Sequence, residues 1–444
     1  MAKVFPFRAL RYNPSKVKPA EVVTQPYDKI TPDMQDRYYA ASPYNLVRVI
    51  LGKSQSRDNE RESVYTRAAA CVNQWRTDGV LVPDAEPSIY LYTQTFRVPG
   101  DSSSTVMERR GFIALGQLED YDQKVVFRHE QTLSKPKADR LNLLRATQAH
   151  FGQLFMLYTD PAAEIDAALR PSTLPTVEVR DEYDVLHRMW KISDRETIQA
   201  VQAKMADKKL IIADGHHRYE TALNYRNEMR KQADGDSSAP YERVMMTFVN
   251  MDAPGLLILP THRVVFGLEN FSIFEMVGKL QVNFEVEDTG PLTNTEGALE
   301  RLHQAGKDRT ALLAVTSHGG FLLRSRPEIK WNGATGLSER QRALDVVQLH
   351  KLVLEGALGL SEEDIRDQKH LKYQRDALEA VNEVARGANA AFLMNPVRME
   401  QVRDIAFAGE VLPQKSTDFY PKLLSGLVGY SLGEATQSSA TGGH

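Results

Sequence analysis

The chain has 444 residues, of which 42% are hydrophobic, 25% charged and 8% aromatic, a composition typical of a soluble globular protein with two or three domains. Its 55 Lys and Arg against 58 Asp and Glu give a formal net charge of −3, which argues against a dedicated nucleic-acid-binding protein. The single cysteine, Cys71, excludes an intramolecular disulfide framework and a multi-cysteine metal site.

Nothing in the hydropathy pattern indicates a membrane protein. No apolar run approaches the roughly 20 residues that span a bilayer, and the start, MAKVFPFRALRYNPSKV, lacks the apolar centre of a secretory signal. We therefore expect a soluble cytoplasmic protein with no membrane or nucleic-acid partner, and the sequence leaves its oligomeric state open. Residues 431–444 are rich in Gly, Ser and Thr and are expected to form a disordered tail.

Helix and strand patterns alternate along the chain. Residues 60–78 carry apolar side chains at helical spacing, whereas 88–96 alternate apolar and polar residues as a strand does. Apolar runs predict further strands in the first part of the chain at 111–116, 152–158, 210–213, 245–249 and 256–260. Later patterns predict helices at 274–280, 294–305, 343–358 and 376–387, and strands at 311–316, 320–324 and 391–394.

The pattern changes near residue 270, where we expect a domain boundary. A first domain would cover 1–270 and a smaller second domain 271–430. Because both parts mix helices and strands, the expected fold class is α/β or α+β with mixed sheets.

The segment 210–222, LIIADGHHRYETA, is the sharpest local feature. Asp214 is expected to cap a helix that follows a short strand, and Gly215 to permit close approach of a ligand or another segment. The free N–H groups and the dipole of such a helix start favour an anion. The side chains on its first turns are His216, His217, Arg218 and Thr221. This arrangement predicts a phosphate-binding site, and the alternative is an ordinary capped helix with a surface histidine pair.

A charged connector over 128–140, RHEQTLSKPKADR, combines residue types that serve phosphoryl transfer. Glu130 is a candidate general base and His129 places an imidazole beside it. The cations that would neutralise a transferring phosphoryl group are Lys135, Lys137 and Arg140. The alternative is a solvated charged loop.

A third cluster, VLPQKSTDFYPKLLSGL over 411–427, would reach across to the first domain. Its candidate ligands are Lys415, Ser416, Thr417 and Lys422. It is not a P-loop, because no Gly precedes the Lys at the required spacing and Pro421 follows. The alternative is a surface loop packed by Phe419 and Tyr420.

Other chemistries are disfavoured. The adjacent His216 and His217 point about 100° apart on a helix, and His129 does not begin an HExxH motif, so a zinc site is not expected. No GxGxxG follows a strand, which argues against a dinucleotide-binding fold. Cys71 lies within an amphipathic helix and is expected to pack rather than react.

Four separate motifs occur in an order that identifies a resemblance. They are Pro26-Tyr27-Asp28, His129-Glu130-x-Thr132 with Lys137 and Asp139-Arg140, Asp214-Gly-His-His-Arg-Tyr219, and Pro413-x-Lys-Ser-Thr417 with Tyr420-Pro-Lys422. On these motifs the chain resembles, over nearly its whole length, the bacterial and archaeal DUF1015 family.

The Asp-Gly-His-x-Arg string is also similar to the nucleotide-binding motif of the ParB/sulfiredoxin superfamily, which includes free-serine kinases that phosphorylate L-serine with a nucleotide. This resemblance covers part of the first domain and implies a ParB/sulfiredoxin-like N-terminal domain with insertions. It also implies that residues 215–218 hold phosphates and that Asp214 lies beside the acceptor or a Mg²⁺ ion. Sulfiredoxin needs a cysteine where His216 stands, and the helix-turn-helix of ParB is not evident. Small-molecule phosphoryl transfer is the branch that remains.

Together these features predict an enzyme: a nucleotide-dependent phosphotransferase that uses ATP or ADP, with Mg²⁺, on a small hydroxylated metabolite such as free L-serine. Glu130 would be the general base, His129 a further catalytic candidate, and Asp214 a Mg²⁺ ligand or a group that orients the acceptor. The predicted phosphate-binding residues are Lys137, Arg140, Gly215, His216, His217, Arg218, Thr221, Lys415, Ser416, Thr417 and Lys422. Two alternatives stay open, a nucleotide or phosphometabolite sensor without catalysis and a phosphomonoesterase such as a phosphoserine phosphatase.

Overall fold

The computed structural model describes residues 1–59, 61–100, 105–130, 134–171, 174–232, 236–331 and 336–433, and for 134–136 it describes the backbone alone. The chain divides into two compact units. Unit 1 contains Met1–Arg128, Thr132–Leu256 and the stretch that begins at Pro421, whereas unit 2 contains His129–Gln131 and Leu257–Tyr420. The division therefore falls before the expected position near residue 270, and the chain returns to unit 1 after unit 2.

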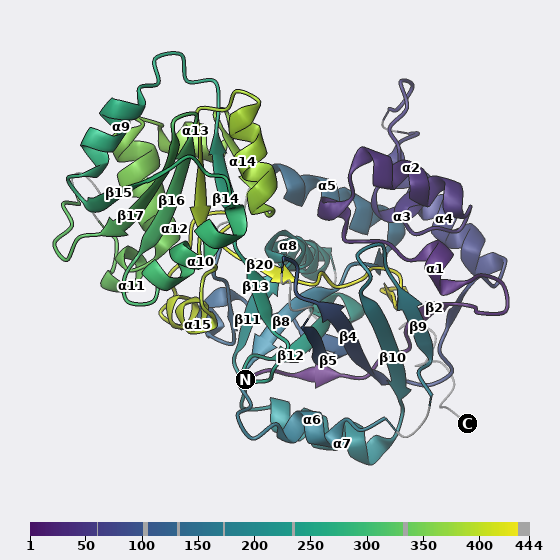
Figure 1. The fold of residues 1–444 in the computed structure, drawn as a ribbon. Coiled ribbons are helices and arrows are strands. Elements are labelled where there is room, and N and C mark those ends of the chain that lie inside the picture. The colour runs from purple at the N-terminus through teal and green to yellow at the C-terminus, as the bar shows by residue number, and fades with distance from the viewer. Residues whose placement is uncertain are drawn as a thin grey trace, which may run out of the picture. The chain divides into compact units, whose positions relative to one another are not determined.

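A mixed sheet forms the centre of unit 1 (Figure 1). In the described part of the chain it has nine strands, eight of them in the order β6-β11-β8-β12-β5-β4-β10-β9, with β1 paired to β5. Their bounds are β1 Val4–Phe5, β4 Ile89–Arg97, β5 Val106–Gln117, β6 Val126–Phe127, β8 Leu154–Tyr158, β9 Val177–Arg180, β10 Leu186–Ile192, β11 Leu210–Asp214 and β12 Arg243–Asn250. The pairs β11–β6 and β12–β8 are parallel, and the other pairs are antiparallel.

Helices and two small strand pairs complete unit 1. The pairs are β2 Leu10–Tyr12 with β3 Leu81–Pro83, and β7 Ala149–His150 with β21 Tyr430–Ser431. The helices are α1 Pro19–Val22, α2 Pro32–Ala41, α3 Val47–Ile50, α4 Val64–Thr77, α5 Ser134–Thr147, α6 Glu164–Ala168, α7 Arg195–Met205 and α8 His216–Gln232, with 3-10 turns at Tyr27–Lys29, Tyr121–Gln123 and Pro240–Glu242. We expected a disordered tail from residue 431, but Ser431 lies in strand β21. Residues 434–444 lie outside the described part of the chain.

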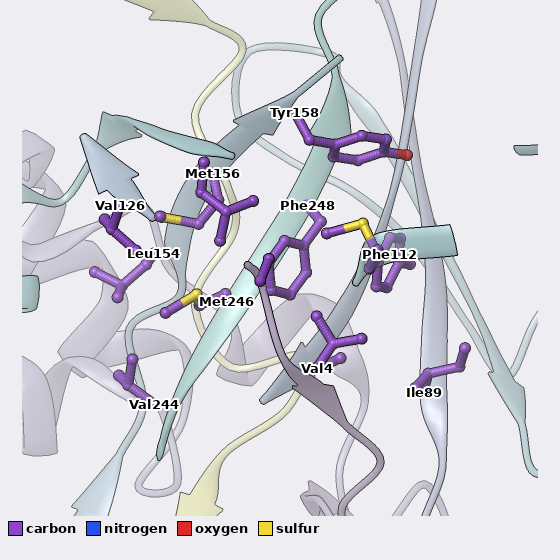
Figure 2. Packing of buried hydrophobic residues seen from close by; sticks show 14 of the residues in the cluster. Val4, Ile89, Phe112, Val126, Leu154, Met156, Tyr158, Val244, Met246 and Phe248 are labelled. Carbon is purple, nitrogen blue, oxygen red and sulfur yellow. The ribbon is translucent and has the colours of Figure 1, made fainter. Parts of the chain in front are cut away.

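One hydrophobic core cluster of unit 1 packs against this sheet (Figure 2). Val244, Met246 and Phe248 alternate along β12, so the period of two in a strand places them on one face, and all three are buried. The Phe248 ring stacks on Phe112 with centroids 5.0 Å apart. Buried residues of α6, α7 and α8 join the same cluster, and α6 and α7 lie side by side (Figure 1). The site-bearing elements β11 and α8 are therefore fixed by this core.

Unit 2 is built around an antiparallel sheet of order β15-β17-β16-β19-β14-β18. Its strands are β14 His262–Val265, β15 Phe284–Gly290, β16 Ala311–Thr316, β17 Gly319–Ser325, β18 Leu371–Gln374 and β19 Ala390–Met394, and a separate pair joins β13 Leu257–Leu259 to β20 Asp418–Tyr420. Its helices are α9 Ile273–Leu280, α10 Thr295–Ala305, α11 Glu339–Arg342, α12 Asp345–Gln348, the π-helix η4 Leu349–Ala357, α13 Glu362–Arg366, α14 Ala377–Ala385 and α15 Met399–Phe407. Both units mix helices and strands, which confirms the predicted α/β class.

Two segments differ from the sequence prediction. The connector expected over 128–140 is helical from Ser134 onward, where α5 begins. Pro136 lies in the first turn of α5, where a helix tolerates proline since the N–H groups there have no intrahelical acceptor. The helix expected over 343–358 changes at Leu349 into a π-helix. Apolar spacing alone does not distinguish the two helix types over so short a segment.

Candidate functional site

The junction between β11 and α8 is a sharp turn at Gly215. This residue has a φ of +99°, and a Cβ atom there would lie 2.9 Å from Leu154 Cδ2 and 3.1 Å from Arg218 Nε. Its carbonyl accepts the first helical hydrogen bond, from Tyr219 N at 2.9 Å. Gly215 therefore occupies the N-cap position that we assigned to Asp214. The correction follows from the helix beginning one residue later than expected, which leaves the Asp214 side chain available for other partners.

Two cations contact the Asp214 carboxylate. Lys422 Nζ donates to Oδ2 at 3.1 Å, and Arg218 Nη2 lies 3.6 Å from Oδ1. The Asp214 side chain is 24% exposed. Burial by itself raises the pKa of this carboxyl. The charges of Lys422, Arg218 and Lys29 outweigh that effect and hold the pKa well below its ordinary value, so Asp214 is ionised at neutral pH.

Two guanidinium groups line a small cavity in unit 1. Arg218 donates to the Gln153 carbonyl, and Arg140 donates to the Ile50 carbonyl at 2.7 Å while it lies 4.1 Å from the centroid of the Tyr27 ring. Both arginines line the cavity, whose volume is about 70 Å³. A single water molecule needs about 10–15 Å³ of such space, so a group of the size of a phosphate or carboxylate fits there.

Other predicted ligands lie on the same helices. His216 is buried and His217 partly exposed at the start of α8, and Thr221 lines the cavity while its hydroxyl donates to the His217 carbonyl at 2.7 Å. Lys137, on α5, forms an ion pair of 2.8 Å with Glu220. A phosphate would therefore compete with the Glu220 carboxylate for the Lys137 ammonium.

The remaining predicted residues belong to unit 2. His129 is fully buried and its Nε2 lies 2.8 Å from the Thr417 hydroxyl. Glu130 Oε1 accepts a hydrogen bond from Lys415 N at 3.0 Å. Ser416 is buried and its hydroxyl donates to the Pro413 carbonyl at 2.5 Å. These contacts hold the motifs at 129–130 and 413–417 together within unit 2.

The structure thus gathers the predicted residues into two groups. Asp214, Arg218, Arg140, Thr221 and Lys422 come together in unit 1. The group within unit 2 contains His129, Glu130, Lys415, Ser416 and Thr417. The clusters at 128–140 and 411–427 are each divided between the units, and the catalytic roles of Glu130 and His129 stay predictions.

Sequence reasoning missed several residues of these groups. Tyr27 contacts Arg140, and the charge of Lys29 lowers the pKa of Asp214, but in the sequence Pro26-Tyr27-Asp28 stood out only as a motif of the resemblance, and neither residue was assigned a role in the site. Gln153, which positions Arg218 through its carbonyl, lies in an apolar strand pattern. In unit 2, Arg263 is 1% exposed and donates to the Lys415 carbonyl at 3.1 Å. In the sequence Arg263 follows a strand-like run, and nothing there indicates a role in this group. Only the structure shows that its guanidinium is buried and donates to backbone carbonyls.

Within the described residues, no group of three or more His, Cys, Asp or Glu side chains is arranged to hold a metal ion. Nor does any helix in that part of the chain combine the length and the apolar character needed to cross a membrane.

No curated protein matches this sequence. Among solved structures, a conserved hypothetical protein from Pyrococcus furiosus is similar at 14% identity and a TM-score of 0.34, over 69% of this chain and 90% of that one. A free serine kinase variant in complex with ADP is similar at 15% identity and 0.35, over 69% and 87%. SbnI with a C-terminal truncation, from Staphylococcus aureus, is similar at 10% identity and 0.34, over 71% and 86%. The family model described as protein of unknown function (DUF1015) matches residues 4–347, and on that match the chain belongs to the DUF1015 family.

Proposed function

We propose that this protein binds the phosphates of a nucleotide at the start of α8 and transfers a phosphoryl group to a small hydroxylated metabolite. The observation that supports the proposal is the contact of two cations, Lys422 and Arg218, with the single carboxylate of Asp214, whose pKa the charge of Lys29 also lowers. The positive end of the α8 dipole adds to this charge. A local excess of positive charge at a helix start is the environment that a phosphate group requires.

Asp214 suits an electrostatic role better than that of a base. Because its pKa is held below the ordinary value, it is a weak proton acceptor at neutral pH. It would orient the acceptor or contact a Mg²⁺ ion brought in with the nucleotide. A single carboxylate is enough for that contact, since Mg²⁺ in nucleotide sites is held by one or two carboxylates together with phosphate oxygens and water. The ion, when bound, would add positive charge beside the phosphates.

The proposed transfer makes one bond and breaks another. The hydroxyl oxygen of the acceptor bonds to the terminal phosphorus of the nucleotide, and the bond from that phosphorus to its bridging oxygen breaks. The hydroxyl proton passes to a general base, and the bridging oxygen leaves with the electron pair. The sequence predicts Glu130, a residue of unit 2, for the role of base, and the variant Glu130→Gln tests that prediction by itself. Arg218 and Lys422 would stabilise the charge that develops on the phosphates. Free L-serine is the first acceptor to test, on the resemblance to free-serine kinases.

The test is a product assay on the full chain. The purified protein is incubated with Mg²⁺, L-serine and either ATP or ADP, and phosphoserine and the shortened nucleotide are measured by mass spectrometry. Equal amounts of the two products support the proposal. Nucleotide binding without product would favour a sensor, and release of phosphate from phosphoserine without nucleotide would favour a phosphomonoesterase. The second result would overturn the transferase assignment, and the first would exclude L-serine as the acceptor.

A further inference from the structure

The backbone around Lys422 is held by uncharged side chains of unit 1. Gln94, on β4, donates from Nε2 to the Lys422 carbonyl at 2.8 Å. Gln153 donates from Nε2 to the Leu424 carbonyl at 2.9 Å. Both glutamines are buried. The segment 421–425 is therefore fixed through its main chain, and the Lys422 ammonium projects from a backbone that has little freedom.

A buried guanidinium lies behind this segment. Arg109, on β5, is 2% exposed and stands directly across the strand pair from Gln94. Its Nε donates to Gln94 Oε1 at 3.1 Å, and its Nη2 donates to the same oxygen and to the Pro421 carbonyl. The guanidinium carbon lies 4.7 Å from the centroid of the Phe155 ring. One side chain thus contacts the residue before Lys422 and the glutamine that holds the Lys422 carbonyl.

Burying the positive charge of Arg109 costs desolvation free energy. Burial lowers the pKa of Arg109 to about 10, while Tyr92 and Asp214 oppose the shift, so the group is still a cation at neutral pH. A neutral donor would satisfy one carbonyl at lower desolvation cost. A planar guanidinium has several donors in a fixed geometry, which lets it fix two segments at once.

We propose that Arg109 is a positioning residue for the candidate site, and that it acts through Pro421 and Gln94 to hold the Lys422 ammonium against Asp214. The inference rests on the proposed function, in which Lys422 contacts a phosphate. At 2% exposure Arg109 acts through these neighbours rather than on the ligand itself.

A double-mutant cycle tests the dependence of one residue on the other. ADP affinity is measured by calorimetry at one ionic strength for the wild type, Arg109→Lys, Lys422→Met and the double variant. Each single substitution is expected to weaken binding about tenfold, and the double variant no further than Lys422→Met alone, because Arg109 has nothing left to position. A loss in the double variant equal to the product of the two single losses would show that the residues act independently and would overturn the proposal.

A matched control separates positioning from general loss of packing. Arg226, on α8, is also 2% exposed and also donates to a backbone carbonyl, that of Leu118, at 2.9 Å. Arg226→Lys is expected to leave ADP affinity unchanged. If Arg109→Lys does not fold, Gln94→Met is carried through the same measurements, since it removes the link from Arg109 through Gln94 to Lys422 and leaves the contact of Arg109 with Pro421.

Hydrogen exchange provides a readout that does not depend on nucleotide binding. Amide exchange over 422–425 is expected to be at least tenfold faster in Arg109→Lys than in the wild type, and unchanged in Arg226→Lys. If the wild type binds no ADP, the proposed function fails. The exchange rates still decide whether Arg109 holds the segment around Lys422 in place. Equal exchange rates in the wild type and Arg109→Lys would overturn the positioning role of Arg109.

Discussion

The Lys422 ammonium lies 3.1 Å from Oδ2 of Asp214, although 208 positions separate the two residues in the sequence. Their side chains are 10% and 24% exposed. Since Arg218 approaches the other carboxylate oxygen, two cations share one anion and the start of α8 keeps a positive excess. Lys422 is therefore the first residue to change.

Lys422→Met should weaken ADP binding about tenfold, because a partly buried positive charge beside the phosphates is lost. The measurement is calorimetric titration at fixed ionic strength. Lys204→Met is the matched control, since Lys204 pairs with Glu164 at 2.5 Å on the surface of unit 1. Equal affinities of the two variants would contradict a phosphate contact at Lys422.

Asp214→Asn should separate binding from turnover. Removing the carboxylate leaves Lys422 and Arg218 uncompensated, so we expect ADP to bind several-fold more tightly. Turnover should fall about a hundredfold, because the group that orients the acceptor or contacts Mg²⁺ is lost. Titration and the product assay measure the two effects on one preparation. Weaker binding together with unchanged turnover would exclude the electrostatic role proposed for Asp214.

The low pKa of Asp214 also predicts a dependence of stability on pH. A carboxyl whose pKa is lower in the folded than in the unfolded chain stabilises the fold above its unfolded pKa of about 3.9, and loses that contribution as the pH falls below it. The unfolding free energy of the wild type should therefore exceed that of Asp214→Asn at pH 7, and the difference should shrink below about pH 4. Urea unfolding at several pH values provides the comparison, and a difference independent of pH would refute the ion-pair assignment.

Glu130→Gln should abolish most of the turnover and leave the fold intact. Glutamine keeps an oxygen that can accept from Lys415 N, whereas it cannot take the acceptor proton. A loss of about 10²- to 10⁴-fold is typical for a general base, with ADP affinity unchanged. Glu178→Gln is the control, because Glu178 pairs with Arg188 on the surface. Wild-type turnover in Glu130→Gln would remove the base assignment.

Gly215→Ala should cost about 1–3 kcal/mol of stability through its left-handed backbone, and it should also weaken ADP binding. The added methyl group would meet Leu154 and displace the Arg218 guanidinium. Gly100→Ala isolates the backbone cost, because Gly100 has a φ of +76° and nothing lies within 4 Å of its added Cβ. Urea unfolding and titration should show a loss of affinity in Gly215→Ala alone.

Much of the fold is predictable because periodicity reports burial directly. The strand expected over 210–213 is β11, and the helix expected over 60–78 contains α4, whose Ser63 and Thr66 form a capping box. The start of α5 was not predictable, because its charges and Pro136 resemble those of a loop and its packing depends on other elements. The π-helix after Gln348 was not predictable either, because apolar spacing does not specify the hydrogen-bond pattern.

The site was predictable where charge clusters beside a strand end, as at Asp214 and Arg218. Lys422 could be proposed from its motif, but its pairing with Asp214 depends on where the chain returns to unit 1. Arg109 gave no signal, because an arginine in a strand normally faces solvent, and only the packed structure shows it buried under Pro421.

The discontinuity of unit 1 has a consequence for how the protein is made. Translation proceeds from the amino end, so the ribosome completes the sheet strands of unit 1 and then the whole of unit 2 before it adds Lys422. During that interval Asp214 and Arg218 lack the ammonium that completes their ion pairs. A product shortened by premature termination after Tyr420 would keep the strands of both main sheets. It would nevertheless lack the Lys422 ammonium that pairs with Asp214.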